Sequence, residues 1–479
     1  MSDPLYTIAI EFVAGSFTNV TSDCLHFSYN RELATYDRGL SIGGCELVMQ
    51  NEERKFTPSN SAGPFYPGLK PNKRIQIQAT YSGSTYNLFS GYINGYTINP
   101  LLGNRTAYIQ ASDRVKIMNM QDIDLPFTVN YNVGSLFTDI LSSLAVSSAD
   151  RVIDGIADVA AFAWFAGRKG TDSINDLLTL GNYQAFVGGD GKVNIRNRYY
   201  QFEGTVVASF NEFLDFGYTL NDDAIGNILR IEGTPRRLST SIGTISWLQT
   251  IETVPASGYI SFWMTYVDPL TLESPTPANS VIFPVTSADF KFNAQSDGAG
   301  ADLTTTTSVN GVLFGSTAVF SLFNGSGQVA YITKFQVRGY SVQKQPTIAY
   351  QEEISSSQVA YGKRAYTLTS NLINDLEYAK NYMVFLVDQK KDPADAPTIS
   401  LKNEWNPQLG LELGSLVYIA ETQTSINSVF SVVNVSHNVE LMRGLEHTTA
   451  YGLEIWKNRS EFILDHVTYG LLDSRRLTL

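Results

Sequence analysis

Histidine is the side chain most often used for acid–base and metal chemistry, and this chain of 479 residues contains only four. His437 and His447 flank the turn Met442 to Gly444 at near-equal distance, so we expect them to face each other across a hairpin. Two facing imidazoles are half of a zinc site, but no third ligand follows at a recognisable spacing. Polar positions on a strand face are therefore the better interpretation. His26, in a predicted strand, and His466, near the C-terminus, have no visible partner.

Two glycine-containing segments have some features of ligand-binding loops. Asp297 and Asp302, with glycines between them, resemble a calcium loop, but the alternating acidic ligands and the terminal Glu are missing. A tight turn explains the segment. Gly188 to Gly191 is not a phosphate-binding loop, because a helix precedes it and a strand follows, so we predict a hairpin tip. The chain has no nucleophile elbow, HExxH or CxxC motif, so we predict no catalytic, cofactor-binding or metal-binding residues and no enzyme activity.

Residues 237 to 340 form an aromatic block that is also rich in Thr, Ser and Gly. Trp247, Tyr259, Trp263 and Tyr266 could form a platform on which sugar rings stack. Such residues more often fill the core of a β-sandwich, and this is the interpretation that the sequence favours.

The composition is that of a folded protein rich in β-structure. Of its residues, 43% are hydrophobic, 12% aromatic and only 17% charged, and a chain of this length should form roughly three or four domains. The 46 acidic residues exceed the 34 basic ones, for a net charge of -12, which argues against a protein that coats nucleic acid. The two cysteines, Cys24 and Cys45, are too few for a disulfide framework and are predicted to be core residues in a reduced compartment.

The start of the chain, MSDPLYTIAIEF, does not have the pattern of a signal peptide. The longest apolar run, Val152 to Gly167, contains Asp154 and Asp158 and is too short to span a bilayer. We therefore expect a soluble protein, made in a cytosol, with no membrane span.

Residues 35 to 113 follow the pattern of a small β-barrel. Ile75, Ile77 and Ala79 alternate with polar residues, as in a strand with one buried face. The spacing returns near the other end of the chain: Phe89 follows Arg74 by 15 residues, as Phe430 follows Ser415. The pattern predicts a duplicated barrel.

The fold predicted is mainly β, with two similar tube-forming β-barrels, a small α/β domain between them and a β-sandwich inserted in the second barrel. The expected parts are a first barrel (1–125), an α/β domain of helices plus a hairpin (126–200), a discontinuous second barrel (201–236 and 341–459), the inserted sandwich (237–340) and a C-terminal docking tail (460–479).

Three helices are predicted from apolar residues at helical spacing. The first begins at Asn132 or Gly134, and the second runs from Ser173 to Leu180. The second is expected to have Thr171 or Asp172 as its cap. The third extends from about residue 370 to 389, where two lysines and Pro393 stop it.

Residues 38–93 and 105–114 resemble the N-terminal barrel of bacteriophage tail and baseplate hub proteins. Later segments keep the order of that family: GGDGKVNIRNR, YTLNDDAIGNILRIEG, YITKFQVRGY, VAYGKRAYTL, LGSLVYIA to HTTAYGLEI, and FILDHVTYGLLD. The resemblance covers nearly the whole chain, although its motifs are structural rather than catalytic. Residues 237 to 340 depart from the minimal hub.

This resemblance implies a virion protein without enzyme activity, located at the tail tip or baseplate and synthesised in the host bacterial cytoplasm. A homotrimeric ring with pseudo-sixfold symmetry would adapt the tail tube to the threefold tip and surround the DNA ejection channel. Its implied partners are the tail tube or distal tail protein, a tip, spike or central fibre protein and the tape measure protein, with receptor-binding proteins on the insert and DNA passing through unbound. The alternative is a carbohydrate-binding adhesin or receptor-binding tail component that acts through the aromatic insert.

Overall fold

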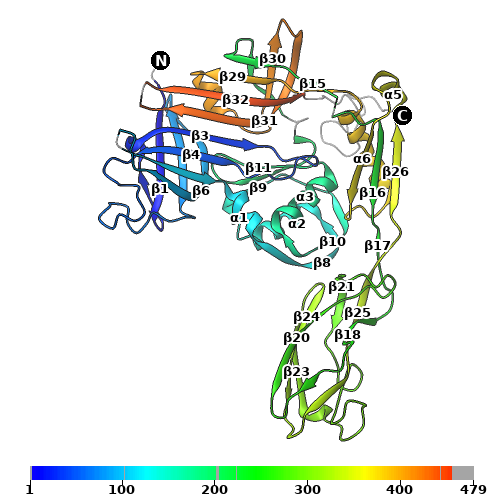
Figure 1. Ribbon diagram of the computed structural model, residues 1–479. Coiled ribbons are helices and arrows are strands. Elements are labelled where there is room, and N and C mark those ends of the chain that lie inside the picture. Colours follow the sequence, from blue (N-terminus) through cyan, green and yellow to red (C-terminus); the bar gives the residue numbers. More distant parts are fainter. Residues whose placement is uncertain (1–2, 102, 201–203, 223, 443, 456–479) are drawn as a thin grey trace.

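The computed structural model describes residues 3–101, 103–200, 204–222, 224–442 and 444–455. Strands dominate the structure (Figure 1). The prediction of a mainly β fold is confirmed. The predicted docking tail, residues 460–479, lies outside the described residues.

The N-terminal unit is a curled antiparallel sheet. Its elements are β1 (Leu5–Val13), β2 (Ser16–Asn19), a 3-10 turn (Thr21–Asp23), β3 (Cys24–Glu32), β4 (Gly44–Gln50), β5 (Arg74–Tyr81), β6 (Ser84–Asn99) and β7 (Thr106–Ser112). Ile75, Ile77 and Ala79 of β5 point into one core, as their spacing predicts. Cys24 and Cys45 are buried free thiols in the same core, which confirms the prediction that they are core residues.

The C-terminal unit repeats this arrangement. It contains β13 (Val206–Phe210), β14 (Asp215–Gly217), β29 (Thr398–Lys402), α7 (Trp405–Gly410), β30 (Leu416–Glu421), β31 (Ile426–Glu440) and β32 (Glu446–Ile455). The antiparallel order β3-β4-β7-β6-β5 of the first unit matches β14-β29-β32-β31-β30 of the second. Phe89 and Phe430 are both buried and lie opposite Ile77 and Val417. The units differ at one edge, where β1 pairs antiparallel with β5 but β13 pairs parallel with β30.

The two units belong to one continuous sheet of 13 strands. Strand β3 pairs antiparallel with β31, from His26 opposite Glu440 to Glu32 opposite Asn434. We call this junction the seam. Among the described strands, pairing ends at β2, β13 and β14, so neither unit closes on itself, and the predicted barrels are two curled parts of an open sheet. The seam gives the backbone groups of both strands partners that separate units would leave unpaired.

A helical unit lies beside the N-terminal unit. It contains α1 (Arg114–Met120), β8 (Asp122–Asn132), α2 (Val133–Ser143), a 3-10 turn (Ser148–Asp150), β9 (Arg151–Ile153), β10 (Val159–Lys169), α3 (Gly170–Gly181), β11 (Gln184–Val187) and β12 (Val193–Arg196). The Asn132 side chain caps α2 by accepting a hydrogen bond from the Ser135 amide, as predicted. Lys169, rather than Thr171 or Asp172, holds the cap position of α3, because the helix begins a turn earlier than its apolar residues suggest.

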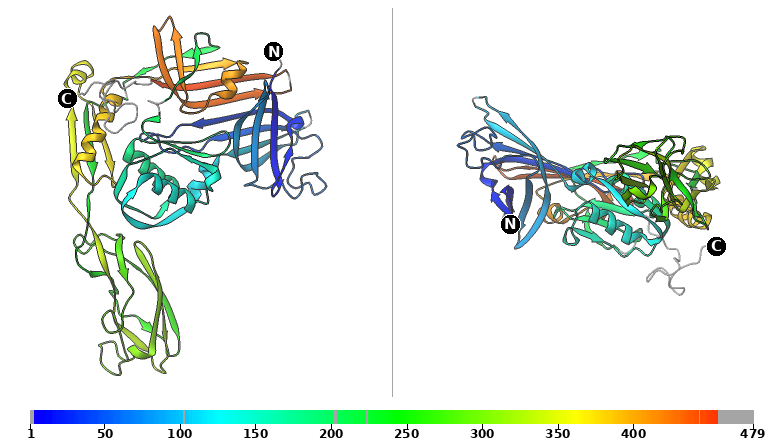
Figure 2. Two further views of the ribbon diagram at one scale, coloured as in Figure 1. Left: turned by 180° about the vertical axis from the view of Figure 1, so that it is seen from behind. Right: turned by 90° about the horizontal axis from the view of Figure 1, so that it is seen from below.

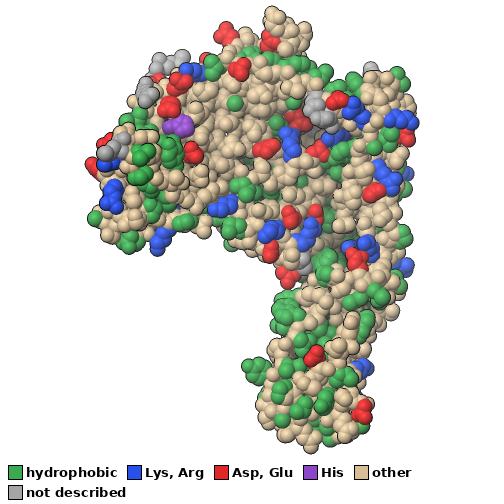
Figure 3. Space-filling model, in the orientation of Figure 1, with side chains coloured by type: hydrophobic (Ala, Val, Ile, Leu, Met, Phe, Trp, Pro, Cys, Tyr) green, Lys and Arg blue, Asp and Glu red, His purple; other side chains and the backbone are tan. Residues whose placement is uncertain are grey.

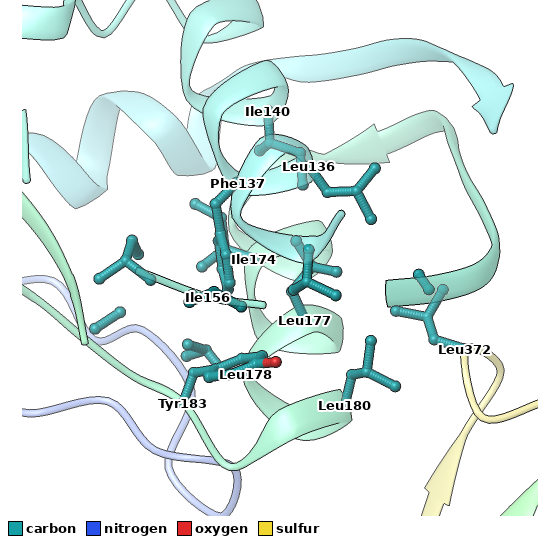
Figure 4. Close-up of a cluster of buried hydrophobic side chains, with 14 of the residues drawn as sticks. Leu136, Phe137, Ile140, Ile156, Ile174, Leu177, Leu178, Leu180, Tyr183 and Leu372 are labelled. Carbon is teal, nitrogen blue, oxygen red and sulfur yellow. The ribbon is translucent and has the colours of Figure 1, made fainter. Parts of the chain in front are cut away.

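Residues expected in the second barrel pack against these helices instead. They form β15 (Leu220–Asn221), β16 (Ile228–Gly233), β26 (Ile348–Glu353), α5 (Ser355–Tyr361), β27 (Ala365–Ser370), α6 (Leu376–Lys390) and β28 (Ala394–Asp395). One core contains Leu229, Leu372 and Met383 together with residues of α2 and α3, and Figure 4 shows Leu372 facing that group. Residues 114–125 of the predicted first barrel join the same core through α1. Helix α6 starts later than predicted because the Asp375 carboxylate caps it at the Tyr378 amide.

The insert has a core of its own and extends from the body (Figures 1 and 2). Its strands are β17 (Arg236–Leu238), β18 (Gly243–Trp247), β19 (Thr253–Val254), β20 (Tyr259–Thr265), β21 (Ala278–Ile282), β22 (Phe290–Asn293), β23 (Thr307–Leu313), β24 (Thr317–Asn324) and β25 (Ala330–Lys344), with a 3-10 turn at Thr304–Thr306. One sheet has the order β20-β24-β23, and the other is built on β25. Phe320 and Phe335 meet between them, with ring centroids 5.0 Å apart.

Candidate functional site

The interior of the seam contains a network of polar side chains around two imidazoles. Nδ1 of His437 lies 2.7 Å from Nε2 of His447, and the Tyr6 hydroxyl lies 2.8 Å from Nδ1 of His447. Thr449 Oγ1 lies 3.1 Å from Nδ1 of His437 and accepts a hydrogen bond of 3.0 Å from Nε2 of Gln408. Tyr6 belongs to the N-terminal unit and the other four residues to the C-terminal unit. The network therefore joins the two units.

The prediction that His437 and His447 face each other is confirmed, and both rings are buried. Burial lowers the pKa of His447 to about 4. Burial, the second imidazole and Arg31 together lower the pKa of His437 well below its usual value. Both rings are thus neutral at pH 7, and one must donate to the other. Tyr29 stacks on His437 at 4.5 Å, which fixes that ring further.

In the part of the chain that the structure describes, no group of three His, Cys, Asp or Glu side chains is placed to hold a metal ion. His26 lies at the rim of the seam, where its Nε2 bonds the Asn438 side chain. His466 lies outside the described residues. The arrangement of the two buried imidazoles is structural, because their nitrogens bond each other and neighbouring hydroxyls.

A carboxylate ties three distant segments together next to the seam. Glu412 Oε1 lies 2.6 Å from Nη1 of Arg31, and its Oε2 accepts a 3.1 Å hydrogen bond from the Gly189 amide. Arg31 also donates to the Val187 carbonyl at 3.1 Å. Burial alone would lower the pKa of Arg31, but the Glu412 carboxylate, Tyr29 and Asp113 together outweigh burial, and the pKa is raised. The hairpin tip predicted at Gly188 to Gly191 is confirmed, and it docks between the two sheet units.

Reasoning from the sequence missed Arg31 and Glu412, although a signal for Arg31 was present. In β3 the buried residues include Phe27, Tyr29 and Arg31, so the two-residue period points Arg31 inward. A buried guanidinium needs an acidic partner. The sequence gives no indication of which of the 46 acidic residues supplies it.

A polar pocket of about 340 Å³ opens beside this carboxylate. The N-terminal unit, the β11–β12 hairpin and the C-terminal unit all contribute to its wall, which includes Asn87, Arg196, Gln408 and His437. Arg196 is already paired with Asp154 at 2.9 Å. The wall combines amides and paired charges, and its shape follows from the meeting of three parts of the fold.

The segment that resembles a calcium loop is a pair of turns. The Asp297 carboxylate accepts a hydrogen bond from the Ala299 amide at 2.9 Å, and the Asp302 carboxylate accepts one from the Thr304 amide at 2.9 Å. Hydrogen bonds with Thr304 lower the pKa of Asp302. Each carboxylate therefore stabilises its own turn, in agreement with the turn interpretation.

Three of the four aromatic residues of the insert that were expected in its core lie on its surface. Tyr266 is buried, but the side chains of Tyr259, Trp263 and Trp247 are 76%, 67% and 43% exposed. The expectation of core residues is therefore wrong for these three. In β20 the even-numbered residues, such as Phe262 and Met264, point inward and the odd-numbered ones point outward. Phe320 and Phe335 already fill the space between the sheets.

None of the helices in the described residues is long and apolar enough to cross a membrane. The sequence matches no protein-family model and no curated protein. Solved structures do match over almost the whole chain. A tail protein from Neisseria meningitidis MC58 aligns with a TM-score of 0.50 at 9% identity, covering 95% of this chain and 98% of that one.

A 43 kDa tail protein of prophage MuSo2 from Shewanella oneidensis aligns with a TM-score of 0.51 at 8% identity, covering 94% of this chain and 98% of its own. The fold of this chain is therefore that of phage tail proteins.

Proposed function

We propose that this protein is a structural hub of a bacteriophage tail. Three chains would form a ring with pseudo-sixfold symmetry that adapts the sixfold tail tube to a threefold tip and surrounds the DNA ejection channel. The likeness to two solved tail proteins over nearly the whole chain supports the tail assignment at the level of fold. The location of the protein in the virion tail is part of the same proposal.

The observation that carries the proposal is the repeated strand order of the two sheet units. A threefold ring of single units offers three equivalent contacts, whereas a tail tube presents six. Two similar units in each of three chains give six quasi-equivalent contacts. Closed cyclic symmetry also satisfies a head-to-tail interface without forming fibres.

Free sheet edges offer places for the ring contacts. Among the described strands, pairing ends at β2 in the N-terminal unit and at β13 and β14 in the C-terminal unit. Unpaired edges bind other strands readily, so edge-to-edge contact between neighbouring chains would cover them. The tube or distal tail protein would meet one face of the ring, and a tip, spike or central fibre protein would meet the other. The tape measure protein would contact the ring from within.

We propose that the hub acts without enzyme activity and does not bind the DNA that passes through it. The imidazoles brought together by the fold are buried in the seam, where they bond each other and the hydroxyls of Tyr6 and Thr449. A net charge of -12 suits a channel wall that repels phosphate. We expect the channel surface of the ring to be neutral to acidic. A continuous basic stripe along it would contradict the proposal.

The test is the mass and symmetry of purified full-length protein. Mass photometry should give a trimer, and class averages from electron microscopy should show a ring with six similar lobes. Because the tube itself can be needed for ring closure, the same measurement is made with the tube protein added. A protein that stays monomeric in both cases would refute the ring.

A further inference from the structure

The outer face of the β20-β24-β23 sheet carries exposed aromatic rings in a regular array. Tyr259 lies opposite Phe323, and Ser261 lies opposite Ser321. Asn310 of β23 lies on the other side of Ser321 and completes the central row. We call these residues, together with Trp263, the aromatic face. Figure 3 shows hydrophobic side chains gathered on the surface of the insert, with few charged groups among them.

The exposed rings are not needed to fill the hydrophobic core of the insert. Phe262 and Phe320, on the inner face of the same sheet, already pack against Phe335 of the other sheet. The outer rings of Tyr259, Trp263 and Phe323 gain nothing from that core, and Phe323 is 48% exposed. Exposed large rings on one sheet face are typical of a binding surface.

The chemistry of the face excludes charged ligands. Strands β20, β23 and β24 contain no Asp, Glu, Lys or Arg. The central row offers hydroxyls and an amide instead, and the Ser261 and Ser321 hydroxyls lie 2.7 Å apart. The Asn310 side chain makes no hydrogen bond to another described residue and is exposed. A nucleic acid or an anionic lipid surface would need basic groups here.

The positions of the aromatic and polar side chains along the face favour a sugar ligand over a protein partner. In a protein interface the aromatic anchors gather at the centre and polar groups form the rim. Here the order is reversed, because Tyr259 and Trp263 lie at the two ends and the polar row lies between them. Four residues of strand place the Cα atoms of Tyr259 and Trp263 about 13 Å apart. A sugar ring has one apolar face of C–H bonds and hydroxyls at its edge, and an oligosaccharide presents several in a row.

We propose that the aromatic face binds an uncharged oligosaccharide. Sugar rings stack on Tyr259 and Trp263, and hydroxyls between them bond to the side chains of Ser261, Ser321 and Asn310. Trp263 is held for this role, since its ring stacks on Phe314 at 5.6 Å and keeps a fixed orientation. The site is independent of the hub proposal, because the insert has its own core.

The experiment measures binding of the full-length protein to an array of neutral and charged bacterial oligosaccharides. We expect binding to at least one neutral oligosaccharide and to no anionic one. Trp263→Ala and Tyr259→Ala should each weaken it about tenfold, as expected for an aromatic anchor. Trp247→Ala is the matched control, because this Trp is also exposed but lies on β18 of the other sheet. Its binding should be unchanged.

Thermal unfolding confirms that each variant is folded, and Asn310→Ala, which removes no ring, tests the polar row separately. The proposal is overturned if no neutral oligosaccharide binds, or if Trp247→Ala loses as much binding as Trp263→Ala. It is also overturned if Trp263→Ala leaves glycan binding intact but changes the mass of the assembly, which would indicate a protein contact.

Discussion

Acid should weaken the seam through its two neutral imidazoles. The perturbation is a fall in pH from 7.5 to 5, compared between the natural protein and His447→Gln, in which the buried titratable group is replaced by a neutral amide. A matched control is His26→Gln, since His26 lies on the same seam but at its rim, outside the buried network.

The direction of the pKa shift of His447 means that acid lowers the stability of the folded protein. The pKa of His447 in the folded protein is about 4, below its ordinary value of 6.5, so the unfolded chain binds more protons as the pH falls. Stability from this group is fully present above pH 6.5 and is lost as the pH falls toward 4. Between pH 7.5 and 5 the loss is about 2 kcal/mol for His447 alone. His437 adds to it in the same direction.

The assay is hydrogen exchange of the β31 amides, expressed as a free energy of opening after correction for the intrinsic exchange rate at each pH. The natural protein and His26→Gln should lose the same opening free energy on acidification. His447→Gln should start lower but lose about 2 kcal/mol less. Equal losses in the natural protein and His447→Gln would refute the reasoning, because acid would then act through groups elsewhere.

Three further results are expected. Gly189→Ala should destabilise the protein by about 2 kcal/mol in urea unfolding, because an added Cβ would lie 2.1 Å from a backbone oxygen, whereas Gly95→Ala meets nothing within 4 Å and should cost less than 1 kcal/mol. Glu412→Gln should lower the free energy of unfolding by about 2 kcal/mol by leaving buried Arg31 without its counter-ion, and equal stability would contradict that role. Replacing residues 238–340 by a short Gly/Ser linker should leave a folded, ring-forming protein, and loss of all soluble protein would count against it.

Local patterns in the sequence predicted much of the fold. The two-residue period identified β5, and the start of α2 was predicted at Asn132 or Gly134, of which the structure has Asn132 as the cap. The equal spacing that leads to Phe89 and Phe430 indicated a repeat, and the two phenylalanines hold corresponding buried positions in it. The near-equal distances of His437 and His447 from one turn predicted that they meet. These features depend on residues close together in the chain or on a hairpin.

Contacts between segments that are far apart in the sequence were harder to predict. The pairing of β3 with β31 joins residues about 410 positions apart, and the strands' own patterns fit a closed barrel equally well. Leu229 and Leu372 have the same apolar character whether they pack in the C-terminal unit or against α3. For the insert, Trp263 was expected in the core because large rings usually lie there. Trp263 points to the solvent because its neighbour in β20, Met264, points into the core, and successive residues of a strand face opposite sides.

The neck of the insert has a consequence for engineering. Arg236 of β17 lies directly opposite Lys344 of β25, so the chain leaves the body and returns to it at neighbouring points of one strand pair. Any independently folding domain with adjacent ends can be grafted at such a pair without stretching either strand, since paired strands are only about 5 Å apart. The insert can therefore be replaced at this strand pair by another folded domain, such as an enzyme, a fluorescent protein or a different ligand-binding domain. The rest of the protein would stay unchanged.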